Sequence, residues 1–177
     1  MVAKSGGGVS MSNFSVKLNP KRPCRYVFEA SLWNGNANQF QLPVKVLLDT
    51  GSFNTVIHKS LVGNHGKMLK QTMMTSVGGF KGEANLCILD KIKIGAHTIE
   101  NVVALAIPFE GELKDHILLG ANVTNNWEFT LSRKRSTMEA TEEFSEEAIA
   151  RKFPYRYCYN NKGRVMALQE MDFELDN

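Results

Sequence analysis

Apolar and polar residues alternate along much of the chain between residues 25 and 131, with the period of β-strands that bury one face. Glycine and asparagine interrupt the alternation at residues 34–36, 78–79 and 95–97. Such residues form the tight turns of β-hairpins, so the pattern predicts hairpins at these three positions. Two later segments, 117–119 and 127–131, are typical of further strands. The sequence therefore predicts an all-β core of about 110 residues, the size of one small domain.

The pattern changes after residue 131. Residues 136–139, Ser-Thr-Met-Glu, have the spacing of a helix capping box, and apolar residues then recur at helical spacing until Pro154. We expect a helix ending there and a hairpin over residues 155–169. The first ten residues are rich in glycine and serine. The predicted organisation is a flexible segment 1–20, a core domain 21–132, and a C-terminal helix and hairpin extension 133–177.

Composition is ordinary for a globular protein of 177 residues, with 43% hydrophobic and 22% charged residues. The net charge of +3 is small and its basic residues are scattered, which argues against nucleic acid as a partner. No apolar run has the roughly eighteen residues of a membrane helix. Three widely spaced cysteines favour free thiols in a reducing compartment. We therefore expect a soluble, cytoplasmic protein without a membrane partner.

The four histidines lack metal-ligand spacing, so no metal or other cofactor is predicted.

A carboxylate, Asp49, directly follows the apolar run 46–48. Taken alone, it could begin an Asx-turn in which the following glycine supplies conformational freedom. Two further elements change this interpretation. One is a glycine-tipped hairpin, and the other is an apolar triplet that ends in glycine. In chain order, the three elements consist of Asp49, Thr50, Gly51 and Ser52, then Val77, Gly78, Gly79 and Phe80, then Ile117, Leu118, Leu119 and Gly120.

Together and in this order, the three elements resemble the retropepsin-like, retroviral-type aspartic proteases, over roughly Arg25 to Leu131. The resemblance implies a closed β-barrel of the acid protease fold. It also implies that residues 49–52 form the catalytic turn, residues 77–80 the tip of a substrate-covering flap, and residues 117–120 a support beneath the active site. The extension after Ser132 has no counterpart in the minimal family pattern.

Peptide hydrolysis by water needs both a base and an acid, and two adjacent carboxyls that share one proton supply both. The chain contains a single Asp-Thr-Gly, so the resemblance implies a homodimer in which one Asp49 from each subunit meets on the two-fold axis. Thr50 would then hydrogen-bond across the axis, and Gly51 would leave room for close approach. Ser52 could donate a hydrogen bond from its hydroxyl to the Asp49 carboxylate. This bond would favour the ionised carboxylate and move the pH range of activity toward acid.

The function predicted in this way is that of a homodimeric aspartic endopeptidase, which hydrolyses peptide bonds in extended polypeptides. The alternative is a catalytically inactive retropepsin-like dimer that binds peptides or serves as a scaffold, because fold and motif do not establish activity. Cleavage that is lost in an Asp49→Ala variant would distinguish the enzyme from the scaffold.

Overall fold

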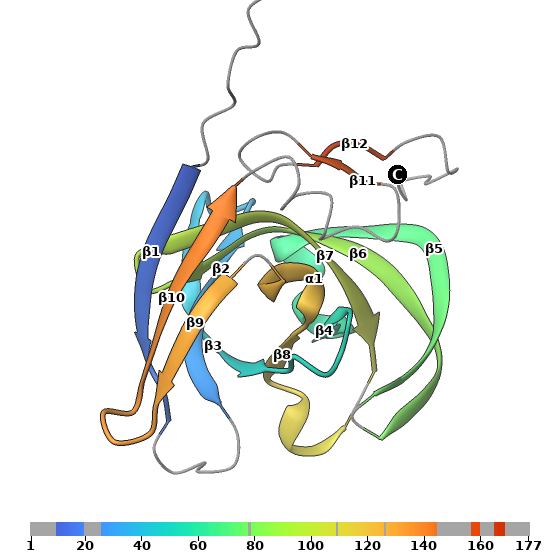
Figure 1. The fold of residues 1–177 in the computed structure, drawn as a ribbon. Helices are drawn as coiled ribbons and strands as arrows, with labels where there is room; N and C mark the ends of the chain where they lie inside the picture. Colours follow the sequence, from blue (N-terminus) through green and yellow to red (C-terminus); the bar gives the residue numbers. More distant parts are fainter. Residues whose placement is uncertain are drawn as a thin grey trace, which may run out of the picture.

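The structure, a computed structural model, describes residues 10–19, 26–77, 79–108, 110–125, 127–144, 157–159 and 165–168 (Figure 1). Its strands are β1 (Ser10–Lys17), β2 (Val27–Asn34), β3 (Gln39–Leu48), β4 (Thr55–His58), β5 (Gly66–Val77), β6 (Phe80–Ile94), β7 (His97–Ile107), β8 (His116–Leu119), β9 (Trp127–Ser132), β10 (Thr137–Phe144), β11 (Tyr157–Tyr159) and β12 (Val165–Leu168). The helical elements are the short helix α1 (Ala121–Thr124) and the 3-10 turns Lys59–Leu61, Gly63–His65 and Gly111–Leu113. No helix among the described residues has the length and apolar character needed to cross a membrane.

Six strands close into a ring, and this confirms the predicted all-β barrel. Their order is β2-β3-β8-β4-β7-β6, and β6 returns to β2 through the pairs of Ser31 with Lys93 and Leu32 with Ile92. Strand β5 continues the sheet outside the ring by pairing with β6. The three predicted hairpins are present as β2–β3, β5–β6 and β6–β7, each antiparallel.

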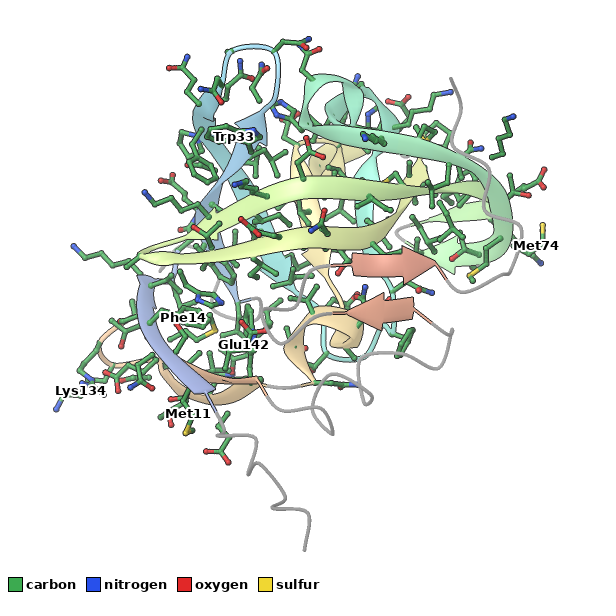
Figure 2. The ribbon with its side chains drawn as sticks, turned by 90° about the horizontal axis from the view of Figure 1, so that it is seen from above. Met11, Phe14, Trp33, Met74, Lys134 and Glu142 are labelled. Carbon is green, nitrogen blue, oxygen red and sulfur yellow. The ribbon has the colours of Figure 1, made fainter. Side chains whose placement is uncertain are left out.

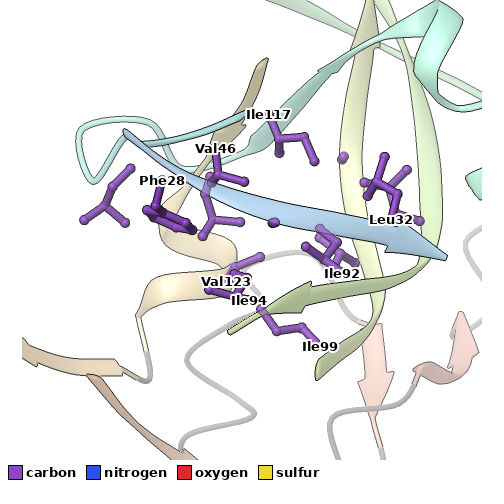
Figure 3. Packing of buried hydrophobic residues seen from close by; sticks show 14 of the residues in the cluster. Phe28, Leu32, Val46, Ile92, Ile94, Ile99, Ile117 and Val123 are labelled. Carbon is purple, nitrogen blue, oxygen red and sulfur yellow. The ribbon is translucent and has the colours of Figure 1, made fainter. Parts of the chain in front are cut away.

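The main hydrophobic cluster fills the barrel interior and continues to the buried side chains of β1, β9 and β10. Figure 3 shows members of this cluster, among them Phe28 from β2, Val46 from β3 and Ile92 from β6, gathered in one interior. A second cluster lies between the β5–β6 hairpin and β4, β7 and β8. Its buried members are Val56, Leu69, Ala84, Leu86, Val103, Leu105, Ile107 and Leu118. The apolar residues that alternate in the sequence thus fill two adjoining cores, and the hairpin covers the smaller one.

A separate three-stranded sheet, β1-β10-β9, lies alongside the barrel (Figure 1). It corrects the expectation that residues 1–20 are flexible, because Ser10–Lys17 forms β1 and pairs with β10 along its whole length. Phe14 and Val16 explain why: both side chains are buried against the barrel, at 6% and 7% exposure. Burial of these two apolar side chains offsets the conformational entropy that residues 10–17 lose when they form a strand.

The helix predicted from the capping-box residues 136–139 is also wrong over its first half, because residues 137–144 form strand β10. Met138, Ala140 and Glu142 are buried while Glu139 is exposed, so the period is two rather than 3.6. The open edges of β1 and β9 pair with this segment and override its local helical spacing. The remainder of that helix, residues 145–153, lies outside the described residues. Within the predicted C-terminal hairpin, β11 and β12 pair antiparallel, and its other residues are likewise outside them.

A buried polar contact joins this sheet to the barrel. The Nε2 atom of His97, at the start of β7, lies 2.6 Å from Oε2 of Glu142, and both side chains are almost completely buried. The ring of Phe14 stacks on the imidazole with centroids 4.5 Å apart, and Ser12 Oγ lies 3.1 Å from Nδ1. Figure 2 shows Phe14 and Glu142 on neighbouring strands at this junction. Strand β1 is therefore fixed by specific contacts as well as by its backbone ladder.

Candidate active site

Asp49 lies at the end of β3, in a turn that leads to β4, and these two strands are not neighbours in the sheet. Strand β8 lies between them, parallel to β3 with Leu48 opposite Leu119, and antiparallel to β4 with Val56 opposite Leu118. The backbone N–H of Asp49 donates to the Leu119 carbonyl at 3.0 Å. All four residues of β8 are buried, which explains the unbroken apolar triplet in the sequence. The support predicted beneath the acid is thus in contact with it.

Residues 49–52 form a compact turn. The Ser52 N–H donates to the Asp49 carbonyl at 3.2 Å, the Asp49 side chain is half-buried, and Thr50 and Gly51 are exposed. The Ser52 hydroxyl donates to the Asn54 carbonyl at 3.0 Å. The predicted hydrogen bond from this hydroxyl to the Asp49 carboxylate is therefore corrected. A hydroxyl has only one proton to donate. The Ser52 hydroxyl donates it to the Asn54 carbonyl, so it has none left to donate to the Asp49 carboxylate.

Gly120 permits the turn and the start of α1 to pack against each other. A Cβ atom at this position would lie 2.4 Å from the Asn54 carbonyl carbon and 2.8 Å from the Phe53 oxygen, both of them backbone atoms. The close approach allows the Ala121 N–H to donate to the Ser52 carbonyl and the Asn122 N–H to the Phe53 carbonyl, each at 2.8 Å. The glycine that ends the apolar triplet is therefore a steric requirement of the acid turn.

Two polar residues that sequence reasoning missed, Thr55 and Asn122, tie this region together. Asn122 Oδ1 accepts from the backbone N–H and the hydroxyl of Thr55, each at 2.8 Å. Its Nδ2 donates to the Val103 carbonyl at 2.8 Å, and the Thr55 hydroxyl accepts from the Gly120 N–H at 3.1 Å. One amide thus links β4, β7 and the segment after β8. The only signal in the sequence was their position, one at the start of a buried strand and one two residues beyond Gly120.

The β5–β6 hairpin carries the second predicted set of site residues at its tip. Val77 pairs with Phe80, both are half-buried, and Gly79 has a φ of +84°, a conformation that favours glycine. Gly78 lies outside the described residues. The hairpin contacts the turn segment through Met73, whose Sδ accepts from Asn54 Nδ2 at 3.7 Å. The structure therefore joins the acid turn to β8 directly, and to the hairpin through a strand residue below the tip.

Two other features of the described residues bear on ligands. No group of three or more His, Cys, Asp or Glu side chains within them is arranged to hold a metal ion. A cavity of about 490 Å³ lies beside β1, between Val16, Phe28 and Lys45, and none of the predicted site residues lines it. The acid turn instead provides one Asp49 carboxylate per chain, and the hydrogen bond from the Asp49 N–H to the Leu119 carbonyl of β8 positions this residue.

Comparison with known families agrees with this geometry. A family model described as aspartyl protease matches residues 33–123, which run from the end of β2 into α1 and contain the acid turn, the β5–β6 hairpin and β8. Comparison with curated proteins gives no match. On the strength of the family match, which covers more than half of the chain, the protein belongs to the retropepsin-like aspartyl protease family.

Proposed function

We propose that the protein is an aspartic endopeptidase that acts as a homodimer, in which each protomer contributes one Asp49. The observation that carries this proposal is the acid turn itself: a half-buried carboxyl at a strand end, fixed by Leu119 on one side and connected through Ser52 to Ala121 on the other. A single carboxyl cannot serve as acid and base at once, and the chain has one Asp-Thr-Gly. A second copy related by a two-fold axis supplies the missing group.

The chemistry follows from two carboxyls that share one proton. The ionised carboxyl takes a proton from a water molecule as the water oxygen bonds to the peptide carbonyl carbon. The protonated carboxyl gives its proton to the carbonyl oxygen. When the resulting tetrahedral intermediate collapses, the carboxyl that took the proton from water passes it to the amide nitrogen, and the other carboxylate takes a proton from one hydroxyl of the intermediate. The C–N bond breaks, which yields one new carboxyl and one new amine.

Two exposed features fit this assignment. Thr50 and Gly51 are open to solvent in the single chain, so they are available for contact with a partner's turn. The β5–β6 hairpin, with its glycine tip, is suited to bend over an extended peptide and to present backbone amides to it. On this proposal the hairpin is the flap, and the substrate is an unfolded or extended polypeptide.

The test is cleavage of a denatured protein between acidic and neutral pH, with an Asp49→Asn variant as an isosteric control. Specific activity should fall on dilution, because active dimers dissociate. Mixing wild-type chain with excess Asp49→Asn chain should suppress activity further, because mixed dimers hold one carboxyl. Activity that is insensitive to both dilution and the added variant would refute a shared site. Peptide binding by the wild type without cleavage at any pH would favour the scaffold alternative.

A further inference from the structure

Strand β5 carries methionines with contrasting surroundings. Met74 is 71% exposed, and Figure 2 shows its side chain pointing away from the hairpin into solvent. Its neighbour Met73 is half-buried and packs against the cluster beneath the hairpin, because successive side chains of a strand face opposite ways. Thioether sulfur is readily oxidised to sulfoxide, which turns an apolar group into a polar one. Both side chains can therefore be oxidised in the same way, but Met74 is surrounded by solvent whereas Met73 packs against other residues.

Met73 lies where the hairpin departs from the body of the protein. The β5–β6 ladder is regular from Thr72 to Val77, but its register shifts between Met68 and Thr72. Leu69, inside this irregularity, is completely buried and anchors the lower part of the strand. Such a bulge bends a strand locally. Met73 is therefore among the first residues of the regularly paired part of the hairpin that lies beyond this bend.

The sulfur of Met73 already contacts that turn segment. Asn54 Nδ2 donates to Met73 Sδ at 3.7 Å, and the carbonyl of the same Asn54 accepts the Ser52 hydroxyl. A thioether is a weak acceptor. A sulfoxide oxygen is a stronger one, and an N–H···O bond spans about 2.9 Å, so an oxygen on this sulfur can meet the amide after a small side-chain rotation. Oxidation would strengthen a contact between hairpin and turn that is weak in the reduced protein.

We propose that Met73 is a modification site at which a peroxide sets the mobility of the β5–β6 hairpin. In this step the O–O bond of the peroxide breaks, one oxygen bonds to Sδ, and the other leaves as water; the sulfur is oxidised and the peroxide is reduced. The sulfoxide then accepts from Asn54 and holds the hairpin against the turn. The effect on cleavage rests on the proposed protease function, whereas the effect on hairpin mobility does not.

The experiment treats the full chain with hydrogen peroxide, locates each sulfoxide by peptide mass spectrometry, and measures amide hydrogen exchange of residues 72–85. Oxidation of Met73 should slow this exchange by about fivefold, the factor expected for one added hydrogen bond of ordinary strength. Methionine sulfoxide reductase should restore the original rate. A Met74→Leu variant should respond as the wild type does, while Met73→Leu should not respond. In Asn54→Leu, oxidised Met73 lacks its donor and the exchange should stay unchanged.

Cleavage measured on the same samples separates the two proposals. If the protein cleaves peptides, oxidation at Met73 should lower its activity, because a hairpin held against the turn opens less often. If it cleaves nothing while exchange slows as expected, the modification site stands and the protease assignment fails. Oxidised Met73 with unchanged exchange, or a Met73→Leu variant that still responds to peroxide, would overturn the inference and leave the protease assignment intact.

Discussion

Replacing Asn122 with alanine tests whether the acid turn depends on a single half-buried side-chain amide. The substitution removes the acceptor of the Thr55 N–H and hydroxyl and the donor to the Val103 carbonyl. Thr55 is 0% exposed and Val103 is 6% exposed, so the two backbone groups have little access to water. Each buried group left without a partner costs about 1–3 kcal/mol, which gives a loss of about 2–6 kcal/mol. A domain's total stability is only about 5–15 kcal/mol.

Urea denaturation at a fixed protomer concentration, followed by tryptophan fluorescence, measures this loss as a lower midpoint with an unchanged slope. Asn125→Ala is the matched control, because Asn125 is exposed just beyond α1 and the change should stay within about 0.5 kcal/mol. Asn122→Asp keeps the acceptor for Thr55 but places an oxygen against the Val103 carbonyl in the position of the donor, so it should also lower the stability at neutral pH. A loss below about 1 kcal/mol for Asn122→Ala would show that the hydrogen bonds are replaced and refute the reasoning.

Three further predictions follow from the rest of the fold. Deleting residues 1–17 removes the buried side chains of Phe14 and Val16, so the free energy of unfolding should fall by about 3–6 kcal/mol. A fall below about 1 kcal/mol would show that β1 is dispensable for stability. Glu142→Ala removes the carboxylate that faces His97 Nε2 and should cost about 1–3 kcal/mol, while Glu142→Gln, which can still accept a hydrogen bond, should cost less; equal urea midpoints for the two variants would contradict this. Burial raises the pKa of the Cys87 thiol to about 12, so its thiolate is scarce at pH 8 and iodoacetamide should label it only after unfolding. Rapid labelling of Cys87 in the native protein, located by peptide mass spectrometry, would be inconsistent with that burial.

The sequence predicted most of the barrel because its strands alternate regularly and its turns carry glycine or asparagine. It failed at residues 137–144, where Met138 and Ala140 fit a strand while the capping-box residues and Phe144 fit a helix. Local pattern cannot decide between the two, and the choice is made by the free edges of β1 and β9, which lie far away in the chain. The error at β1 has the same origin, since its partner β10 was assigned to a helix.

At the acid turn, sequence reasoning placed the carboxyl and its supporting strand but not the side chains that hold them. Thr55 and Asn122 are 67 positions apart, and a hydrogen bond between distant polar residues leaves no periodic trace. The sequence allows the Ser52 hydroxyl to donate to Asp49, yet the direction of this hydroxyl depends on where the Asn54 carbonyl lies. Elements follow from pattern, whereas hydrogen-bond directions follow from three-dimensional geometry.

The position of β8 between β3 and β4 has a consequence for how the protein is made. Both arms of the turn leave the ribosome well before the strand that joins them, since Leu48 must pair with Leu119 and Val56 with Leu118. Closing so large a loop slows folding relative to pairing between neighbours. A nascent chain that stops before His116 would carry every residue of the acid turn without the carbonyl that receives the Asp49 amide. The acid turn therefore stays incomplete during synthesis until Leu119 has been translated.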